Sequence, residues 1–396
     1  MNSRQGVSWQ RLFSIVLLVG TFSLATNLQS PLQTHAVEED RTATDGADWP
    51  LFRGNPAGTG VATSTLPEDL ELLWEFRTED SLFAATAAIV EDTIYLGDAD
   101  KWFYAIELET GRKKWSHEVE MGFLGSAAVR DGRVFVGDSD GIFYCLDAKT
   151  GNVLWKQETE AEINSSPNFY KDSVLIGSQD GSLYRFRMSD GSIIWKYTIE
   201  ASGGIQCSPT LGGHHAFICG CDGKLHVIDV ETGSSVETVE IGDPTLSTPA
   251  VIESNVYFGT EGATLFDVNW RQAKIIWRYQ NSRQRTSYRS SPAVSDRGIV
   301  IGGRNKLVEL IDLSGQRDWS FPTKGRIDSS PVIVDNRVFI GSADGRLYGL
   351  NLETGDKVWS YDGGAAFNAS PAVAQGRLVI GNDDGVLYCF GQNRTE

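Results

Sequence analysis

Short stretches of alternating hydrophobic and polar residues run along most of the chain, a pattern typical of β-strands rather than helices. In residues 166–177, SPNFYKDSVLIG, two such stretches flank a polar turn. Asp180-Gly181 follows and favours a tight hairpin turn, because both central positions of that turn need positive φ. Residues 182–187 and 192–199 then give two further stretches. The pattern predicts four short antiparallel strands within about 40 residues.

The same pattern recurs along the chain with a period of about 40 residues. Segments 137–155, 177–195 and 341–359 match almost position for position. A glycine opens each copy, and we align eight: Gly97, Gly137, Gly177, Gly220, Gly259, Gly302, Gly341 and Gly381. A tryptophan closes seven copies: Trp74, Trp115, Trp155, Trp195, Trp277, Trp319 and Trp359. Glu237 stands at the eighth closing position. A repeat of this length predicts a solenoid or a propeller.

Four strands per repeat favour a propeller, so we predict an all-β, eight-bladed β-propeller of four-stranded antiparallel blades. The repeats occupy residues 72–391. The first copy begins with a fourth strand only, at 72–76, and the last copy ends after a third strand, at 386–390. Pairing these two strands completes the eighth blade and closes the ring, which leaves no open edge between blades.

The residues before the repeats predict export. Arg4 and Arg11 precede an apolar run at 12–25, and small residues that suit cleavage follow at Ala25 and Ala36. This is the three-part pattern of a signal peptide at 1–36, with cleavage after Ala25 or Ala36. The apolar run is shorter than the roughly 20 residues that span a bilayer, so we expect no membrane span after cleavage.

The remaining parts are a lead-in segment at 37–71 and a tail at 392–396. No cysteine precedes Cys145, so we expect no lipoprotein anchor. The predicted location is the periplasm or the exterior, and the predicted form is a monomer.

Composition narrows the classes of function. The chain is 41% hydrophobic and 22% charged, as expected for a folded protein. Its net charge of −17 argues against nucleic-acid binding, which needs an excess of Lys and Arg. Five cysteines are too few to hold 396 residues together by disulfides.

The repeat resembles the pyrroloquinoline-quinone (PQQ) type repeat, through its G-x-x-D-G turn, aromatic third strand and T-G-x-x-x-W close. The segments 48–56, DWPLFRGNP, and 66–80 are similar to the opening of quinoprotein alcohol dehydrogenases. The resemblance implies either a quinone-dependent dehydrogenase or an outer-membrane assembly scaffold of the BamB type. In the dehydrogenases it implies a quinone lidded by two adjacent disulfide-linked cysteines, beside Ca²⁺ held by Glu, Asn and Asp.

The expected dehydrogenase site is missing from this sequence. The nearest approach to an adjacent cysteine pair is Cys219-Gly220-Cys221, and spacings of 40–42 residues between closing positions leave no room for pocket-building insertions. The turn aspartates belong to different blades, so we interpret them as turn residues rather than Ca²⁺ ligands. We therefore predict no cofactor, PQQ and Ca²⁺ included, and a non-enzymatic, BamB-like scaffold. The alternative is a quinone-dependent or other small-ligand oxidoreductase.

Departures from the repeat mark a candidate binding face. The link after Trp277 is longer than other links and carries Arg283, Arg285 and Arg289 next to Tyr288. The positions before Ser-Ser-Pro contribute polar side chains at the mouth of the ring: Asn164, Gln206, Asp328 and Asn368. We predict that an envelope protein or an anionic envelope ligand docks here, because arginine binds carboxylate or phosphate through a bidentate fork.

Both sets of departures also have structural interpretations. The arginines at the long link would pair with acids of neighbouring turns, and the mouth side chains would bond to the next blade. The segment 269–273, NWRQA, stands in place of the usual Asp-x-x-Thr-Gly turn. It contains Trp270, which we expect on an exposed corner.

Overall fold

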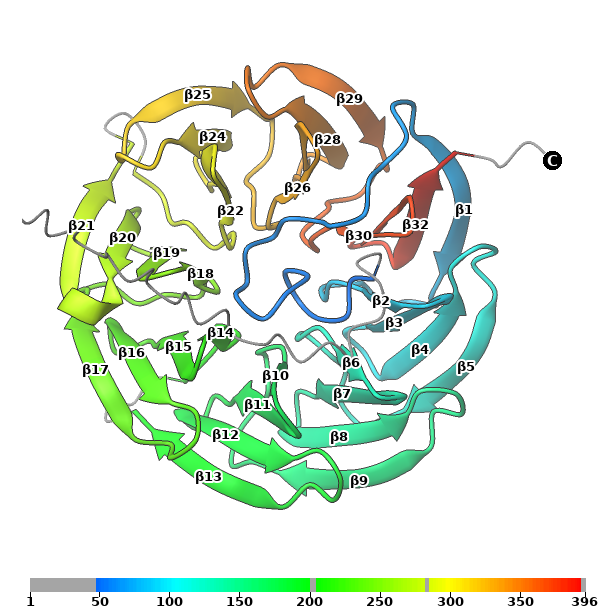
Figure 1. The fold of residues 1–396 in the computed structure, drawn as a ribbon. Coiled ribbons are helices and arrows are strands. Elements are labelled where there is room, and N and C mark those ends of the chain that lie inside the picture. Colours follow the sequence, from blue (N-terminus) through cyan, green and yellow to red (C-terminus); the bar gives the residue numbers. More distant parts are fainter. Residues whose placement is uncertain (1–47, 200–203, 282–284, 393–396) are drawn as a thin grey trace, which may run out of the picture. The chain divides into compact units, whose positions relative to one another are not determined.

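The computed structural model describes residues 48–199, 204–281 and 285–392. The predicted signal peptide and the last four residues lie outside this part of the chain. Within it, the strands form eight four-stranded antiparallel sheets arranged in a ring, so the predicted eight-bladed propeller is confirmed (Figure 1).

The first four blades follow the chain in order from the innermost to the outermost strand. They are blade 1, β2 (Ala88–Val90), β3 (Thr93–Gly97), β4 (Trp102–Glu107) and β5 (Lys113–Glu118); blade 2, β6 (Ala128–Arg130), β7 (Arg133–Gly137), β8 (Ile142–Asp147) and β9 (Val153–Glu158); blade 3, β10 (Asn168–Tyr170), β11 (Ser173–Gly177), β12 (Ser182–Arg187) and β13 (Ile193–Thr198); and blade 4, β14 (Thr210–Gly212), β15 (His215–Cys219), β16 (Lys224–Asp229) and β17 (Ser235–Glu240).

The other four blades repeat this order, except that the last takes its outermost strand from the start of the chain. They are blade 5, β18 (Ala250–Ile252), β19 (Asn255–Gly259), β20 (Leu265–Asn269) and β21 (Lys274–Tyr279), with the 3-10 helix η1 (Trp270–Gln272) between the last two; blade 6, β22 (Ala293–Ser295), β23 (Gly298–Gly302), β24 (Leu307–Ile311) and β25 (Arg317–Pro322); blade 7, β26 (Val332–Val334), β27 (Arg337–Gly341), β28 (Arg346–Asn351) and β29 (Lys357–Asp362); and blade 8, β30 (Ala372–Ala374), β31 (Arg377–Gly381), β32 (Val386–Gly391) and β1 (Glu71–Arg77).

Ring closure occurs where the repeat count placed it. Strand β1 pairs antiparallel with β32, with Trp74 opposite Cys389 and Arg77 opposite Val386. The two ends of the propeller sequence therefore share one sheet, and the first and last strands cover each other's edges.

The closing tryptophans join each blade to the next. The indole N–H of Trp155 donates to the backbone oxygen of Met188 at 3.0 Å, at the start of the following blade's outer turn. A Cβ added to Gly191 in that turn would lie 2.7 Å from the same indole. Gly191 also has φ of 74°, so both the turn and the packing favour glycine. The T-G-x-x-x-W pattern is thus an inter-blade contact.

The alignment of Gly220 as the fourth opening glycine was wrong by one position. Gly177 lies opposite Leu183 at the end of its strand, and in blade 4 it is Cys219 that lies opposite Leu225. Elsewhere the opening glycine leaves room for a large side chain, since a Cβ at Gly177 would lie 2.5 Å from Ile205 Cγ2. At the equivalent of Ile205 the next link carries Thr245, a smaller residue that suits a cysteine.

The lead-in segment lies against the inner edges of the blades, across the middle of the ring (Figure 1). Trp49 and Ile89 of β2 exchange two backbone hydrogen bonds of 2.8 Å. Further along the segment, backbone oxygens accept N–H groups from innermost strands, such as Ala57 from Val251 and Thr59 from Val294. These strands have no sheet neighbour on their inner side, so the segment satisfies donors that the ring leaves unpaired.

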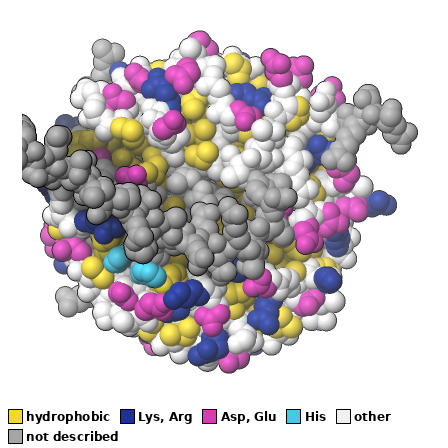
Figure 2. Space-filling view, in the orientation of Figure 1, with side chains coloured by type: hydrophobic (Ala, Val, Ile, Leu, Met, Phe, Trp, Pro, Cys, Tyr) yellow, Lys and Arg dark blue, Asp and Glu magenta, His cyan; other side chains and the backbone are white. Residues whose placement is uncertain are grey.

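The part of the chain that the structure describes has no helix with the length and hydrophobicity needed to cross a membrane. On the face shown in Figure 2, acidic and basic side chains are interspersed around the rim.

Candidate functional site

One face of the ring carries both the turns between second and third strands and the links between blades. Ala99, in such a turn, donates its N–H to Leu82 O in the preceding link, and Phe123 in the next link donates to Asp98 O. We call this the mouth face. The prediction that these two kinds of loop share a face is confirmed.

The turn aspartates hold their own blades together. Asp98 Oδ1 accepts backbone N–H groups of Asp100, Lys101 and Trp102, and its Oδ2 accepts the Tyr104 hydroxyl at 2.9 Å. Asp138 repeats this arrangement with Tyr144, and its burial raises its pKa. Each of these carboxylates is hydrogen-bonded within its own blade, so the two do not converge on a common position where a metal ion could bind. Among the described residues, no cluster of His, Cys, Asp or Glu could hold a metal ion.

The arginine link is only partly available for binding. Arg283 lies outside the described residues. Arg285 is exposed, whereas Arg289 Nε donates to Glu261 Oε1 at 2.8 Å across the blade boundary. The structural alternative, pairing with an acid of a neighbouring turn, therefore holds for Arg289. With 39% of its side chain exposed, Arg289 still reaches solvent.

Tyr288 was predicted as a contact residue for a partner, and this was wrong because the side chain is only 1% exposed. Its hydroxyl donates to Oε2 of Glu309, a fully buried carboxylate of β24. Tyr279 and Asn281 donate to the other oxygen, at 2.8 and 3.0 Å. The unusual link thus serves in part to supply donors to a buried acid at the boundary between blades 5 and 6.

The polar mouth residues mostly bond to neighbouring side chains. Asn164 Nδ2 donates to Glu162 at 3.2 Å, and Asn368 Nδ2 donates to Asp383 at 2.6 Å. Gln206 makes a long contact of 3.5 Å with Gln179. These bonds agree with the structural alternative of local hydrogen bonding, and the role of these side chains toward a partner stays a prediction.

Two arginines that the sequence interpretation missed converge on Asp328. Arg304 binds both carboxylate oxygens, at 2.7 and 2.8 Å, and Arg326 Nε binds one of them at 3.1 Å. Burial is the largest single influence and opposes ionisation of Asp328, but the hydrogen bonds and positive charges of Arg304 and Arg326 together outweigh it and lower its pKa. The signal in the sequence was the turn Gly303-Arg304-Asn305-Lys306, which replaces the usual acidic turn with two cations.

Together these side chains form a cationic arc over blades 5 to 7 of the mouth face. We define the arc as Arg285, Arg289, Arg304 and Arg326. Its four positive charges meet two paired acids, Glu261 and Asp328. The arc therefore keeps a net positive charge on a protein whose net charge is −17.

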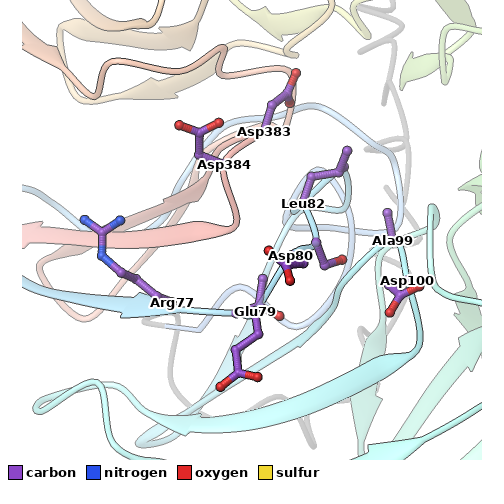
Figure 3. A pocket seen from close by; sticks show the side chains of 10 residues that line it. Arg77, Glu79, Asp80, Leu82, Ala99, Asp100, Asp383 and Asp384 are labelled. Carbon is purple, nitrogen blue, oxygen red and sulfur yellow. The ribbon is translucent and has the colours of Figure 1, made fainter.

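An acidic pocket lies elsewhere on the mouth face, at the seam where the ring closes. It has a volume of about 830 Å³ and is lined by residues of the β1 link and of the turns in blades 1 and 8. Figure 3 shows the carboxylates of Glu79, Asp80, Asp100, Asp383 and Asp384 around it, with Arg77 at one side. The mouth face thus has a cationic side and an anionic side.

Trp270 was expected on an exposed corner, and this was also wrong. The side chain is 5% exposed, and its ring packs against His215 and Phe217 of blade 4, with centroids 4.6 and 5.4 Å apart. Trp270 belongs to the structural core rather than to a binding surface.

All five cysteines are free thiols, and four of them are buried. Cys207 Sγ accepts the N–H of Cys219 at 3.2 Å and contacts its carbonyl oxygen at 3.0 Å. Ser165 makes the same pair of contacts with Gly177 in blade 3, so Cys207 replaces a serine. Burial raises the pKa of Cys207 to about 12, which keeps it a thiol.

The described residues do not fit the quinone and Ca²⁺ of the dehydrogenases. The lid of adjacent, disulfide-linked cysteines has no counterpart here, and the turn carboxylates are bound to their own backbone. We therefore derive no chemistry through that cofactor.

Comparison with known proteins gives one family and several structures. Residues 59–208 and 200–393 match the family described as outer membrane protein assembly factor BamB. No curated protein sequence matches the chain.

Among solved structures, BamB from Moraxella catarrhalis is 18% identical, with a TM-score of 0.69, over 82% of this chain and all of that one. A europium-containing methanol dehydrogenase is 13% identical, with a TM-score of 0.76, over 88% of this chain and 99% of that one. The quinohemoprotein alcohol dehydrogenase from Comamonas testosteroni is 16% identical, with a TM-score of 0.73, over 90% and 82% of the two chains. At these identities the likeness establishes the fold alone.

Proposed function

Since the chain belongs to the outer membrane protein assembly factor BamB family, we propose that it is an exported, non-enzymatic scaffold that binds an envelope protein on its mouth face. The pattern of residues 1–36, typical of a signal peptide, supports export to the periplasm or the exterior. The same fold also occurs in dehydrogenases, so the distinction rests on the side chains of this chain.

The observation that carries the proposal is the pair of guanidinium groups on Asp328. One carboxylate balances one of the two charges of Arg304 and Arg326, and 53% of the Arg326 side chain is exposed. Exposed arginines of this kind retain N–H donors for a second carboxylate. The partner we propose presents acidic side chains to the cationic arc.

Exposed apolar side chains on the mouth face, across the ring from the arc, offer a second kind of contact. Met121 and Leu124, in the link between blades 1 and 2, are 49% and 42% exposed. A face that carries both charged and large exposed apolar side chains is typical of protein interfaces. A protein partner therefore suits this face better than a free inorganic anion.

Site-specific photo-cross-linking tests the proposal. A photoreactive amino acid at Thr286, exposed beside Arg285, should cross-link to an envelope protein in cells. The matched control is Thr150, which is exposed in an outer turn of blade 2 on the opposite face. Equal cross-linking from both positions, or none from Thr286, would contradict docking on the mouth face.

The dehydrogenase alternative has its own test. The purified protein is mixed with PQQ and Ca²⁺, and its ultraviolet–visible spectrum and dye-linked alcohol oxidation are measured. We expect no stoichiometric quinone spectrum and no oxidation. Tight quinone binding with turnover would replace the scaffold by an enzyme.

A further inference from the structure

A buried arginine lies at the inner edge of the ring, apart from the mouth face. Arg53 of the lead-in segment is 1% exposed. Its Nη2 donates to the backbone oxygen of Pro292, at the start of blade 6, at 3.0 Å. Its Nε and Nη1 are buried and have no hydrogen-bond partner among the described residues.

Among the described residues, no carboxylate pairs with Arg53 to compensate its charge. Its guanidinium carbon lies 5.9 Å from the centroid of the Phe52 ring, a distant cation–π contact. Burial lowers the pKa of Arg53 to about 9, so the group is still mostly protonated at neutral pH. A buried cation of this kind is strongly unfavourable unless something balances it.

The lead-in segment is folded around this side chain. Gly60 N donates to Arg53 O at 3.1 Å, which closes a loop from residue 53 to residue 60. A Cβ on Gly60 would lie 1.8 Å from Arg53 Nη2, so the loop admits the guanidinium only because residue 60 is glycine. Arg53 itself has φ of 67°, an unfavourable conformation for a residue with a side chain. The burial of Arg53 is therefore a built feature of the segment.

The geometry of a guanidinium decides which ligand suits it. It has five N–H bonds, arranged so that two pairs of them point in parallel directions. The single bond to Pro292 can occupy only one of these pairs, and the other stays free to bind two oxygens side by side. Carboxylates and other small oxyanions match this spacing.

Serine residues next to Pro292 and along the inner edges of the blades contribute hydroxyl groups. Ser291, directly before Pro292, accepts the N–H of Thr248 through its Oγ and donates its own N–H to Ser330 Oγ. Such links run from blade to blade around the inner edge, through Ser126, Ser166 and Ser208 as well. In each, the hydroxyl oxygen accepts, which leaves its proton able to donate.

We propose that Arg53 is the anion-binding residue of a site for a small oxyanion, of the size and charge of formate or acetate. The site is enclosed between the lead-in segment and the inner edges of the blades. The site is too buried for a macromolecular ligand, so it is separate from the proposed docking of a partner. Its occupant neutralises Arg53 and ties the lead-in segment to the ring.

Crystallography and thermal unfolding test the proposal on the purified protein. Crystals of the unaltered protein soaked in sodium bromide should show an anomalous peak within hydrogen-bond distance of Arg53 Nε or Nη1, because the halide competes for the same donors. Sodium formate should raise the melting temperature in a concentration-dependent way, since a ligand that binds only the folded state stabilises it. The Arg53→Met variant should lose this dependence.

The crystal result needs no variant, so a failure of Arg53→Met to fold leaves the test intact. Ordered waters on both nitrogens with no anomalous peak would overturn the proposal. An equal response to formate in the variant and in the unaltered protein would do the same.

Discussion

The ring of Trp270 meets that of Phe217 edge to face, at 68° and with centroids 5.4 Å apart, although the two residues belong to different blades. In blade 2 the equivalent of Phe217 is Phe135, which packs at 5.9 Å against Trp155 from the fourth strand of its own blade. Blade 4 has Glu237 at that fourth-strand position. Trp270 therefore supplies, from the next blade, the indole that blade 4 lacks.

This exchange predicts a coupled pair of substitutions. Trp270→Ala should lower the free energy of unfolding by about 3–5 kcal/mol, because it removes a large buried side chain. Adding Glu237→Trp should restore part of the loss, since the new indole starts from the position that tryptophan holds in the other blades. Urea unfolding of the two single variants and the double variant measures the coupling. If the two effects were strictly additive, the indole at position 237 would not occupy the space that Trp270 fills.

The sequence predicted the fold well because the repeat carries its own register. Glycine turns, Ser-Ser-Pro and tryptophan recur at fixed spacing, so blade number and ring closure follow from counting. Sequence reasoning failed where a contact crosses blades in a way that the repeat does not encode. Trp270 and Tyr288 both stood out as departures, but only the structure shows that Glu237 and Glu309 explain them. A departure from a repeat can compensate for another departure as readily as it can mark a site.

The candidate site was predictable only in part for the same reason. The choice of face follows from blade topology, whereas ion pairs depend on side chains from separate repeats. Arg304 and Asp328 are 24 residues apart and meet because adjacent blades bring a turn and a link together. Arg53 lies in a segment outside the repeats, so no register predicts its burial.

Asp267 gives a prediction about pH. Its side chain is buried, and burial raises its pKa from 3.8 to about 6 despite hydrogen bonds from Asn255. Between these two values the folded state binds more protons than the unfolded state, so its contribution to stability is present at low pH and falls as pH rises through about 4 to 6. A pKa raised from 3.8 to about 6 corresponds to a change of about 3 kcal/mol in the free energy of unfolding.

The difference in unfolding free energy between the unaltered protein and Asp267→Asn, measured from pH 4 to pH 7, isolates this effect. The variant should gain relative stability as pH rises. A difference that stays constant with pH would show that Asp267 does not titrate in this window.

The cationic arc gives a prediction about binding. Replacing Arg285 and Arg289 together by Ala should leave the fold intact, because an exposed ion pair such as Arg289 with Glu261 contributes about 1 kcal/mol or less. Affinity for the cross-linked envelope protein should fall by about 2 kcal/mol, or roughly 30-fold, if these arginines are hot spots. Titration calorimetry against that protein measures the change.

The control for this variant is Arg112→Ala with Lys149→Ala, two exposed cations in outer turns on the opposite face. It removes positive charge without touching the arc and should bind normally. Equal loss in both variants would point to long-range attraction by net charge rather than to a contact at the arc.

The last prediction concerns the one blade in which a cysteine replaces the opening glycine. Where glycine opens a blade, the facing link residue is large, and a Cβ at Gly97 would lie only 2.4 Å from Phe123 Cβ. Blade 4 has Cys219 in that register and Thr245 at the link position, so the larger side chain of the cysteine is matched by a smaller side chain in the link.

Thr245→Ile in the unaltered protein should therefore overpack this boundary and lower the free energy of unfolding by about 1–3 kcal/mol. In a Cys219→Gly background, the same substitution recreates the pair that Gly177 and Ile205 form in the preceding blade, and it should be tolerated or stabilising. Thermal unfolding of the four proteins in this cycle gives the coupling energy, and a value near zero would mean that the two positions vary independently.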